Sequence, residues 1–318
     1  MSTVINKLRN KKKQAFKTED KPRTKKSQLL NFTEESYLER TSRPFYSLIF
    51  LLPFIVLYEF GTFTINTDVF NQSQIRVVAF VWLQNLLESI GFSGRFAWAA
   101  PPFAIIIILL SLQFTSGKKW KFMYRDFPPM LIECVLLAVP LIVLTLFLSS
   151  AKLQINFNKL YGYEVKSQAN VLPMCASISD SNSQRSDENT SSTMPKQSLA
   201  ANIVTGIGAG IYEELVFRLI LICILLFLFQ DIIRMTHINS IVLAVLISAG
   251  LFSAHHHIDF FSGQMSTVDP FDFTRFVFRT IAGVYFAILF AFRGFGITAG
   301  THAFYNIIAV FITVRFFQ

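Results

Sequence analysis

The sequence predicts an all-α fold, a polytopic integral membrane helix bundle of seven or eight transmembrane helices. Of the 318 residues, 52% are hydrophobic and only 15% are charged, and the mean hydropathy is +0.46. Soluble domains carry about 25% charged residues, so this chain has too little polar surface to be a soluble protein. Its apolar residues also gather in segments of about twenty, the length of a helix that crosses a bilayer.

The N-terminal segment, residues 1–45, is predicted to be a basic, disordered cytoplasmic tail. It holds twelve Lys and Arg against five Asp and Glu, which is +7 of the net charge of +9. Basic residues before a first membrane helix are typical of a cytoplasmic N-terminus, and they can contact anionic lipid headgroups. No nucleic-acid recognition motif accompanies them, so we expect no nucleic-acid partner. We expect the chain in the cell membrane, with the bilayer itself as a partner.

Seven apolar segments are long enough to cross the bilayer, namely 46–63, 97–114, 129–149, 200–230, 238–257, 273–292 and 297–317. An eighth segment, 75–91, is interrupted by polar side chains and is either a span or a helix at the membrane interface. The connection 115–127 carries four basic residues. The positive-inside rule places it in the cytoplasm only if 75–91 does not cross. The topology after the first span therefore stays open.

A polar segment divides the membrane part into two halves. Residues 164–199 are rich in Ser and Asn and lack apolar periodicity, which predicts a flexible loop. It separates N-terminal membrane helices at 46–163 from a membrane core at 200–318. The first half has few ionisable residues and is expected to be packing scaffold. The three cysteines form neither a disulfide pattern nor a metal-ligand pattern.

Three polar clusters interrupt the apolar segments of the second half, and the first is Glu213-Glu214-Leu-Val-Phe-Arg218. A charged side chain at bilayer depth costs about 2.5 kcal/mol or more, so such residues pair or line a functional cavity. Glu214 and Arg218 lie four apart on one helix face, which predicts an ion pair. Glu213 points away from Arg218 and suits a general base. Gly206 and Gly210 share its face, either for helix packing or to leave room for water or substrate.

The other two clusters contribute imidazoles and an amide. Residues 255–257 are three consecutive histidines at the end of an apolar segment, so at least one faces inward. Adjacent histidines on a helix diverge by about 100°, which makes the run a weak zinc signal. His302 and Asn306 lie four apart and share a face, either as a buried hydrogen-bonded pair or as two donors for one oxyanion.

A carboxylate, an imidazole and a pair of donors on separate apolar helices indicate a hydrolase that activates water. The sequence contains no HExxH zinc motif and no GxSxG serine motif. It also shows no internal repeat, which disfavours a transporter.

These clusters also match a known family. EELVFR fits EExxxR, Phe252 to His256 fits FxxxH, and HAFYN fits HxxxN, in the order in which that family carries them. The segment 200–318 resembles the CPBP family, which comprises the type II CAAX prenyl endopeptidases and bacterial Abi-like relatives. The resemblance implies an intramembrane endopeptidase with about eight helices, acting on a peptide or membrane-protein substrate.

The resemblance also implies roles for individual residues. Glu213 and His256 would activate water, and His302 and Asn306 would stabilise the oxyanion. The supporting residues would be Glu214, Arg218 and His255. The FxxxH spacing selects His256, although the Ala-His pairing of the family favours His255.

The leading hypothesis is therefore a glutamate-type intramembrane protease that uses no metal or other cofactor. A second hypothesis is an intramembrane metalloprotease with zinc held by His256, His302 and a Glu. A third is a non-catalytic membrane immunity or binding protein that keeps the site as a peptide pocket.

Overall fold

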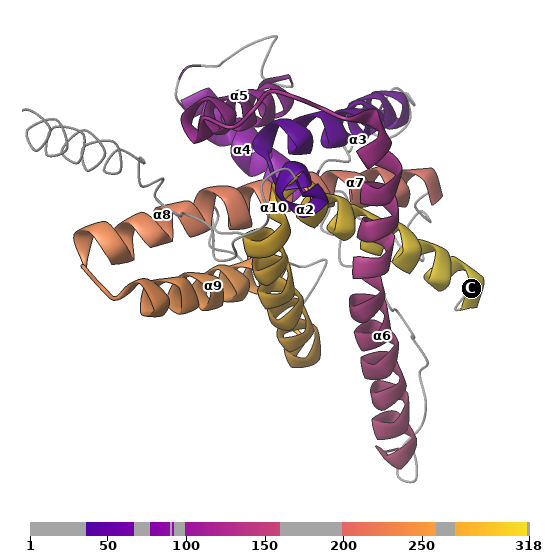
Figure 1. The fold of residues 1–318 in the computed structure, drawn as a ribbon. Helices are drawn as coiled ribbons and strands as arrows, with labels where there is room; N and C mark the ends of the chain where they lie inside the picture. Colours follow the sequence, from indigo (N-terminus) through magenta and orange to yellow (C-terminus); the bar gives the residue numbers. More distant parts are fainter. Residues whose placement is uncertain are drawn as a thin grey trace, which may run out of the picture. The chain divides into compact units, whose positions relative to one another are not determined.

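The computed structural model describes residues 36–66, 77–89, 91, 99–159, 199–258 and 271–316. The predicted tail up to residue 35 and the predicted loop 164–198 lie outside them. Within the described residues the helices are α2 (Tyr37–Thr41), α3 (Pro44–Asn66), α4 (Val78–Ser89), α5 (Ala100–Ser116), α6 (Phe127–Lys159), α7 (Leu199–Glu214), α8 (Ile222–Leu226), α9 (His237–Ala254) and α10 (Phe273–Phe316), and no strand is present (Figure 1). The all-α membrane bundle is confirmed.

Five helical stretches are long and apolar enough to cross a bilayer, namely Pro44–Ile65, Tyr124–Leu148, Leu199–Ile232, His237–Ala254 and Phe273–Arg315. The stretch Leu199–Ile232 comprises α7, α8 and two π-helical segments, Leu215–Leu221 and Phe227–Ile232. The last stretch consists of two helices, because Gly294 (φ 74°, ψ 179°) interrupts α10 and divides it into two parts. Together with the shorter apolar helix α5, these make seven segments of membrane-helix character.

Contacts between residues far apart in the chain fix the directions of these segments. For the second half they are Gly206 with Asn306, Gly210 with Ala303, Ser253 with Phe276, and Gly283 with Ala249. For the first half they are Phe45 with Gln113, Cys134 with Ile297, and Thr145 with Tyr305. The start of α3 therefore lies beside the end of α5, and the second part of α10 runs parallel to α6 and antiparallel to α7. The first part of α10 runs antiparallel to α6, since Tyr285 contacts Leu137 and Arg293 contacts Glu133.

Helix α4 is the described part of the segment for which the sequence left two possibilities. Its twelve residues span about 18 Å at 1.5 Å per residue, well short of the roughly 30 Å hydrocarbon core. A helix of this length does not cross, so the connection 115–127 returns to the side on which α3 begins. The basic loop and the N-terminal end of α3 therefore lie on one side.

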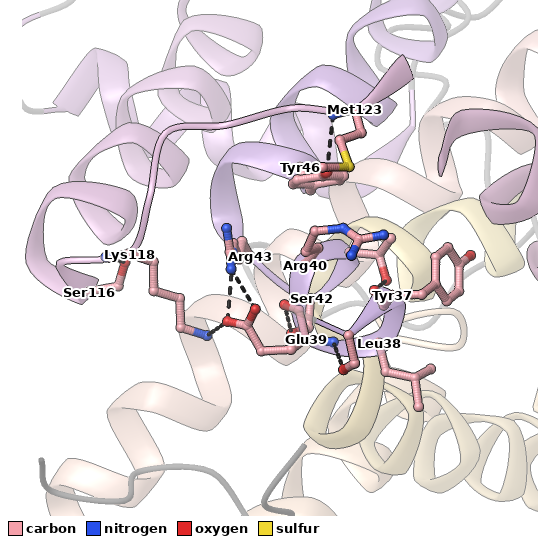
Figure 2. Close-up of polar contacts among 12 residues, drawn as sticks. Tyr37, Leu38, Glu39, Arg40, Ser42, Arg43, Tyr46, Ser116, Lys118 and Met123 are labelled. Carbon is pink, nitrogen blue, oxygen red and sulfur yellow. Dashed lines mark hydrogen bonds and ion pairs between the residues drawn. The ribbon is translucent and has the colours of Figure 1, made fainter. Parts of the chain in front are cut away.

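A cluster of polar residues holds this side together, and it includes the end of the predicted tail (Figure 2). Glu39 of α2 pairs with Arg43 and with Lys118, and Arg40 makes two hydrogen bonds to Asp126. Burial raises the pKa of the Glu39 carboxyl, but the hydrogen bond and charge of Arg43 and the charge of Lys118 outweigh it and hold that pKa below its ordinary value. Within this part of the predicted tail, residues 37–41 form α2 and α3 begins at Pro44 after a short turn, and the charged side chains have partners.

The break in α10 is part of the same cluster. Arg293, directly before Gly294, pairs with Glu133 of α6 and donates hydrogen bonds to the Leu38 carbonyl and the Thr41 hydroxyl of α2. A Cβ on Gly294 would lie 2.8 Å from the Ser42 carbonyl oxygen, and a φ of 74° disfavours any other residue. Backbone strain and the close approach of the turn after α2 both require glycine at this turn.

Candidate active site

The first polar cluster lies where α7 passes into the π-helical segment. Arg218 Nε is 3.1 Å from Glu214 Oε2, and both side chains are completely buried, so the predicted ion pair is present. The Arg218 guanidinium also lies 4.1 Å from the centre of the Phe252 ring, a cation–π contact. Among the described residues no ion pair joins Glu213 to Arg218. Glu213 is 3% exposed and faces the histidines instead.

The glycines on the Glu213 face serve close helix packing. A Cβ on Gly210 would lie 2.5 Å from the Ala303 backbone nitrogen, and a Cβ on Gly206 would lie 3.0 Å from the Asn306 Cβ. Small residues let two helix backbones approach in this way. Of the two roles that the sequence left open for these glycines, the structure shows packing of α7 against the second part of α10.

This close approach brings the third cluster onto the first. His302 Nδ1 is 2.8 Å from Glu214 Oε1, and His302 Nε2 is 3.8 Å from Glu213 Oε2. The ring of His302 stacks on Phe286 at 4.5 Å. Asn306 lies one turn further along and donates a hydrogen bond from Nδ2 to the Gly206 carbonyl at 3.1 Å. Both side chains are completely buried.

The histidine run lies beyond the end of α9, which stops at Ala254. His255 hydrogen-bonds through Nδ1 to the Phe252 carbonyl, and its Nε2 is 3.7 Å from Glu213 Oε1. The rings of His255 and His256 lie 3.9 Å apart. Their expected divergence of 100° does not apply, because it holds only within a helix. Both imidazoles lie near Glu213, and His255 presents Nε2 to it.

His257 faces a different neighbourhood. Its Nε2 is 3.4 Å from the guanidinium of Arg279, and its ring contacts Phe271 and Phe276. The three histidines therefore have two environments: His255 and His256 lie in the Glu213 cluster, and His257 packs against the first part of α10.

Several polar atoms in the cluster are completely buried without a hydrogen-bond partner among the described residues. They are Glu213 Oε2, His255 Nε2, His302 Nε2 and Asn306 Oδ1. Leaving such atoms unsatisfied costs free energy, so buried polar groups of this kind normally bond to water or a ligand. The four atoms come from α7, the turn after α9, and α10, and all belong to the polar clusters that the sequence identified.

Three residues place possible ligand atoms close enough together to bind one metal ion. One atom each of Glu213, His255 and His256 lie within 4.8 Å of one another. Imidazole and carboxylate are ordinary zinc ligands, so these residues fit the metalloprotease hypothesis with His255 in place of His302.

The sequence did not identify one neighbour of this cluster. Trp82 of α4 contacts the His255 ring edge-on with ring centres 5.6 Å apart, and it also contacts Phe217. It belongs to the half of the chain that was expected to be scaffold. A lone Trp in a short apolar segment gives no signal of its own, because its role depends on where α4 packs.

Comparison with known families agrees with the geometry. Residues 195–308 match the family model described as type II CAAX prenyl endopeptidase Rce1-like. No curated protein and no solved structure gives a significant match to the chain. The matched segment contains all three polar clusters, and the resemblance to the CPBP family is confirmed. With its long apolar helices, the chain is a multi-pass membrane protein, and its residues 195–308 are similar to a CAAX-type peptidase family.

Proposed function

Because residues 195–308 belong to the Rce1-like family of type II CAAX prenyl endopeptidases, we propose that this protein is a glutamate-type intramembrane endopeptidase. It hydrolyses a peptide bond of a peptide or membrane-protein substrate with water activated by Glu213. The observation that carries the proposal is the buried carboxylate of Glu213, which lies beside His255 and His302 with one oxygen unsatisfied among the described residues.

Water activation falls to Glu213 and an adjacent imidazole. When Nδ1 of His255 donates its proton to the Phe252 carbonyl, Nε2 carries the lone pair and faces Glu213 Oε1. Two acceptors 3.7 Å apart do not bond directly, but a water between them can donate one proton to each. The family motif selects His256 for this role, whereas the geometry favours His255. We propose His255 as the imidazole that shares the water, with the His256 ring in tilted contact with it.

In this mechanism His302 and Asn306 stabilise the oxyanion. With Nδ1 donating to Glu214, a doubly protonated His302 points its Nε2 proton toward the Glu213 side of the site. One amide proton of Asn306 bonds to Gly206, and the second is available to a developing oxyanion. Donors that are fixed before the reaction stabilise the transition state without reorganisation. Close packing of α7 against α10 fixes both.

Glu214 and Arg218 hold these groups in place. Glu214 joins His302 through one oxygen and Arg218 through the other. With an imidazolium at His302, two carboxylates and two cations balance within the buried cluster. Such balance is required at this depth, since an uncompensated buried charge is costly.

The reaction then proceeds in two steps. Glu213 takes a proton from the bound water as its oxygen attacks the carbonyl carbon, and the carbonyl oxygen becomes an oxyanion held by His302 and Asn306. The carbon–nitrogen bond then breaks as the proton passes from Glu213 to the leaving amine. The carboxylate is regenerated, and the products are a new carboxyl terminus and a new amine.

The test is the variant Glu213→Gln, compared with the exposed control Glu88→Gln. Purified proteins are assayed on a quenched fluorogenic CAAX peptide in farnesylated and unmodified form, and membranes from cells expressing each variant are searched for new protein N-termini. We expect Glu213→Gln to lose about 10²–10⁴ in rate while it still folds and inserts, because Gln keeps the volume of Glu but cannot accept the proton. Cleavage products that are the same in Glu213→Gln and wild type would refute the proposal.

A zinc-dependent mechanism is the second candidate, favoured by the grouping of Glu213, His255 and His256. The same assay after treatment with a strong chelator separates the two mechanisms. We expect activity to be retained. Loss of activity that added zinc restores would assign the metalloprotease mechanism instead. A non-catalytic immunity or binding protein would keep its cellular phenotype in Glu213→Gln.

We further propose that the protein lies in the cell membrane and that its N-terminus is in the cytoplasm. The structure brings the basic loop 115–127 to the side on which α3 begins, so the two basic segments support the same orientation. Seven segments that each cross the membrane once would then place the C-terminal end of α10 on the opposite side.

A further inference from the structure

We propose that Trp82 is a specificity-determining residue, which sets the size of the apolar substrate side chain next to the scissile bond. This inference rests on the proposed function. It concerns a half of the chain that lies outside the segment matched by the family model.

Trp82 occupies a distinctive position among the rings that surround the site. Phe217 and Phe252, which also contact His255, are 2% and 0% exposed. Phe286, stacked on His302, is completely buried. Trp82 is only partly buried although it contacts the same imidazole. A substrate side chain can therefore reach Trp82 without opening the packed core, whereas the phenylalanines belong to that core.

Helix α4 is held firmly enough to fix this ring. Phe80 contacts Tyr212 edge-on at 4.9 Å, and Tyr212 directly precedes Glu213. Leu83 is buried next to Trp82 in the chain, and Leu86, one turn beyond Trp82, is 53% exposed. The helix thus docks one face on α7 beside Glu213 and leaves the opposite face open.

The geometry of attack brings the substrate to this ring. The reacting carbonyl carbon must come within about 3–3.5 Å of the water held by Glu213 and His255. The side chain of the residue after the cleaved bond is joined to that carbonyl carbon through the amide nitrogen and one Cα, so it lies within a few ångströms of the His255 ring. Trp82 has its ring centre 5.6 Å from that ring. An apolar side chain next to the scissile bond is therefore in van der Waals reach of the indole.

The test uses three peptides that differ only in the residue after the cleaved bond, which is Ala, Val or Phe. For each we measure kcat/KM with wild type, Trp82→Ala, Trp82→Phe and the matched control Leu86→Ala, which shortens an exposed side chain of the same helix. We expect Trp82→Ala to raise the Phe-to-Val ratio of kcat/KM by about 10-fold or more, since a pocket discriminates by about that factor per methylene. The ratio for Trp82→Phe should lie between those of wild type and Trp82→Ala, and Leu86→Ala should keep the wild-type ratio.

The ratio separates this inference from its premise, because a merely structural role for Trp82 lowers all three rates together. If wild type cleaves the peptides and the ratio is unchanged in Trp82→Ala and Trp82→Phe, the specificity role is refuted and the proposed function stands. If wild type cleaves none of them and releases no new N-termini in membranes, both are refuted.

Discussion

Substitution of Gly210 by Ala should disable the site without touching any catalytic group. The new Cβ would lie 2.5 Å from the Ala303 nitrogen, 2.7 Å from its Cα and 2.8 Å from its Cβ. Two of these atoms are backbone atoms of α10, so no side-chain rotation relieves the clash. An ordinary contact begins at 3.4 Å, so the two helices must separate by about 0.9 Å at this point.

The separation acts directly on the catalytic residues. Glu214 stands one turn from Gly210 and His302 directly precedes Ala303, so their hydrogen bond of 2.8 Å would lengthen toward 3.7 Å, beyond bonding range. A misplacement of about 1 Å can cost about 10²-fold in rate, and overpacking costs about 1–3 kcal/mol of stability. We therefore expect Gly210→Ala to lose about 10²-fold in kcat and to melt at a lower temperature.

The control is Gly250→Ala in α9, where a new Cβ meets nothing within 4 Å. Because Ala favours a helix over Gly by about 1 kcal/mol, this variant should be as stable as wild type or more so, with full activity. Both variants are purified in detergent and compared by peptide cleavage and by thermal unfolding. If Gly210→Ala matches Gly250→Ala in both measurements, close packing of α7 on α10 does not position the site.

Two further predictions concern residues around Glu213. We expect His255→Ala to lose nearly all single-turnover cleavage and His256→Ala to keep part of it, and the reverse order would return the water-sharing role to the motif histidine. For the buried ion pair we expect Glu214→Gln and Arg218→Leu each to lower the detergent melting temperature as well as activity, since leaving one buried charge unpaired costs about 3–5 kcal/mol. Wild-type melting in both variants would contradict the ion pair.

Most of what the sequence could predict about the site came from the spacing of residues within one helix. The pairing of Glu214 with Arg218 follows from four residues of one helix, and it is present. The bond between Glu214 and His302 joins residues 88 apart, so only the packing of the two helices reveals it. The oxyanion role of His302 and Asn306, which their spacing offered as one of two possibilities and the family resemblance also implies, stays a prediction.

The histidines show why helical periodicity has limits. The rings of His255 and His256 were expected to diverge because α9 was expected to continue to residue 257. The helix ends at Ala254, and the turn that follows brings the two rings into contact, with their centres 3.9 Å apart. Trp82 was beyond prediction for a related reason, since its contact with His255 depends on the docking of a short helix that no local pattern reveals.

The turn at Gly294 bears on how the chain is assembled in the membrane. The last two spans reverse direction at a single residue, so ribosomal synthesis delivers them to the insertion machinery as one unit without a hydrophilic linker between them. Glu133 and α2 are made long before Arg293, and the arginine completes their cluster only when this last unit arrives. A chain that terminates before residue 293 lacks both the cation that pairs with Glu133 and the second part of α10, which carries His302.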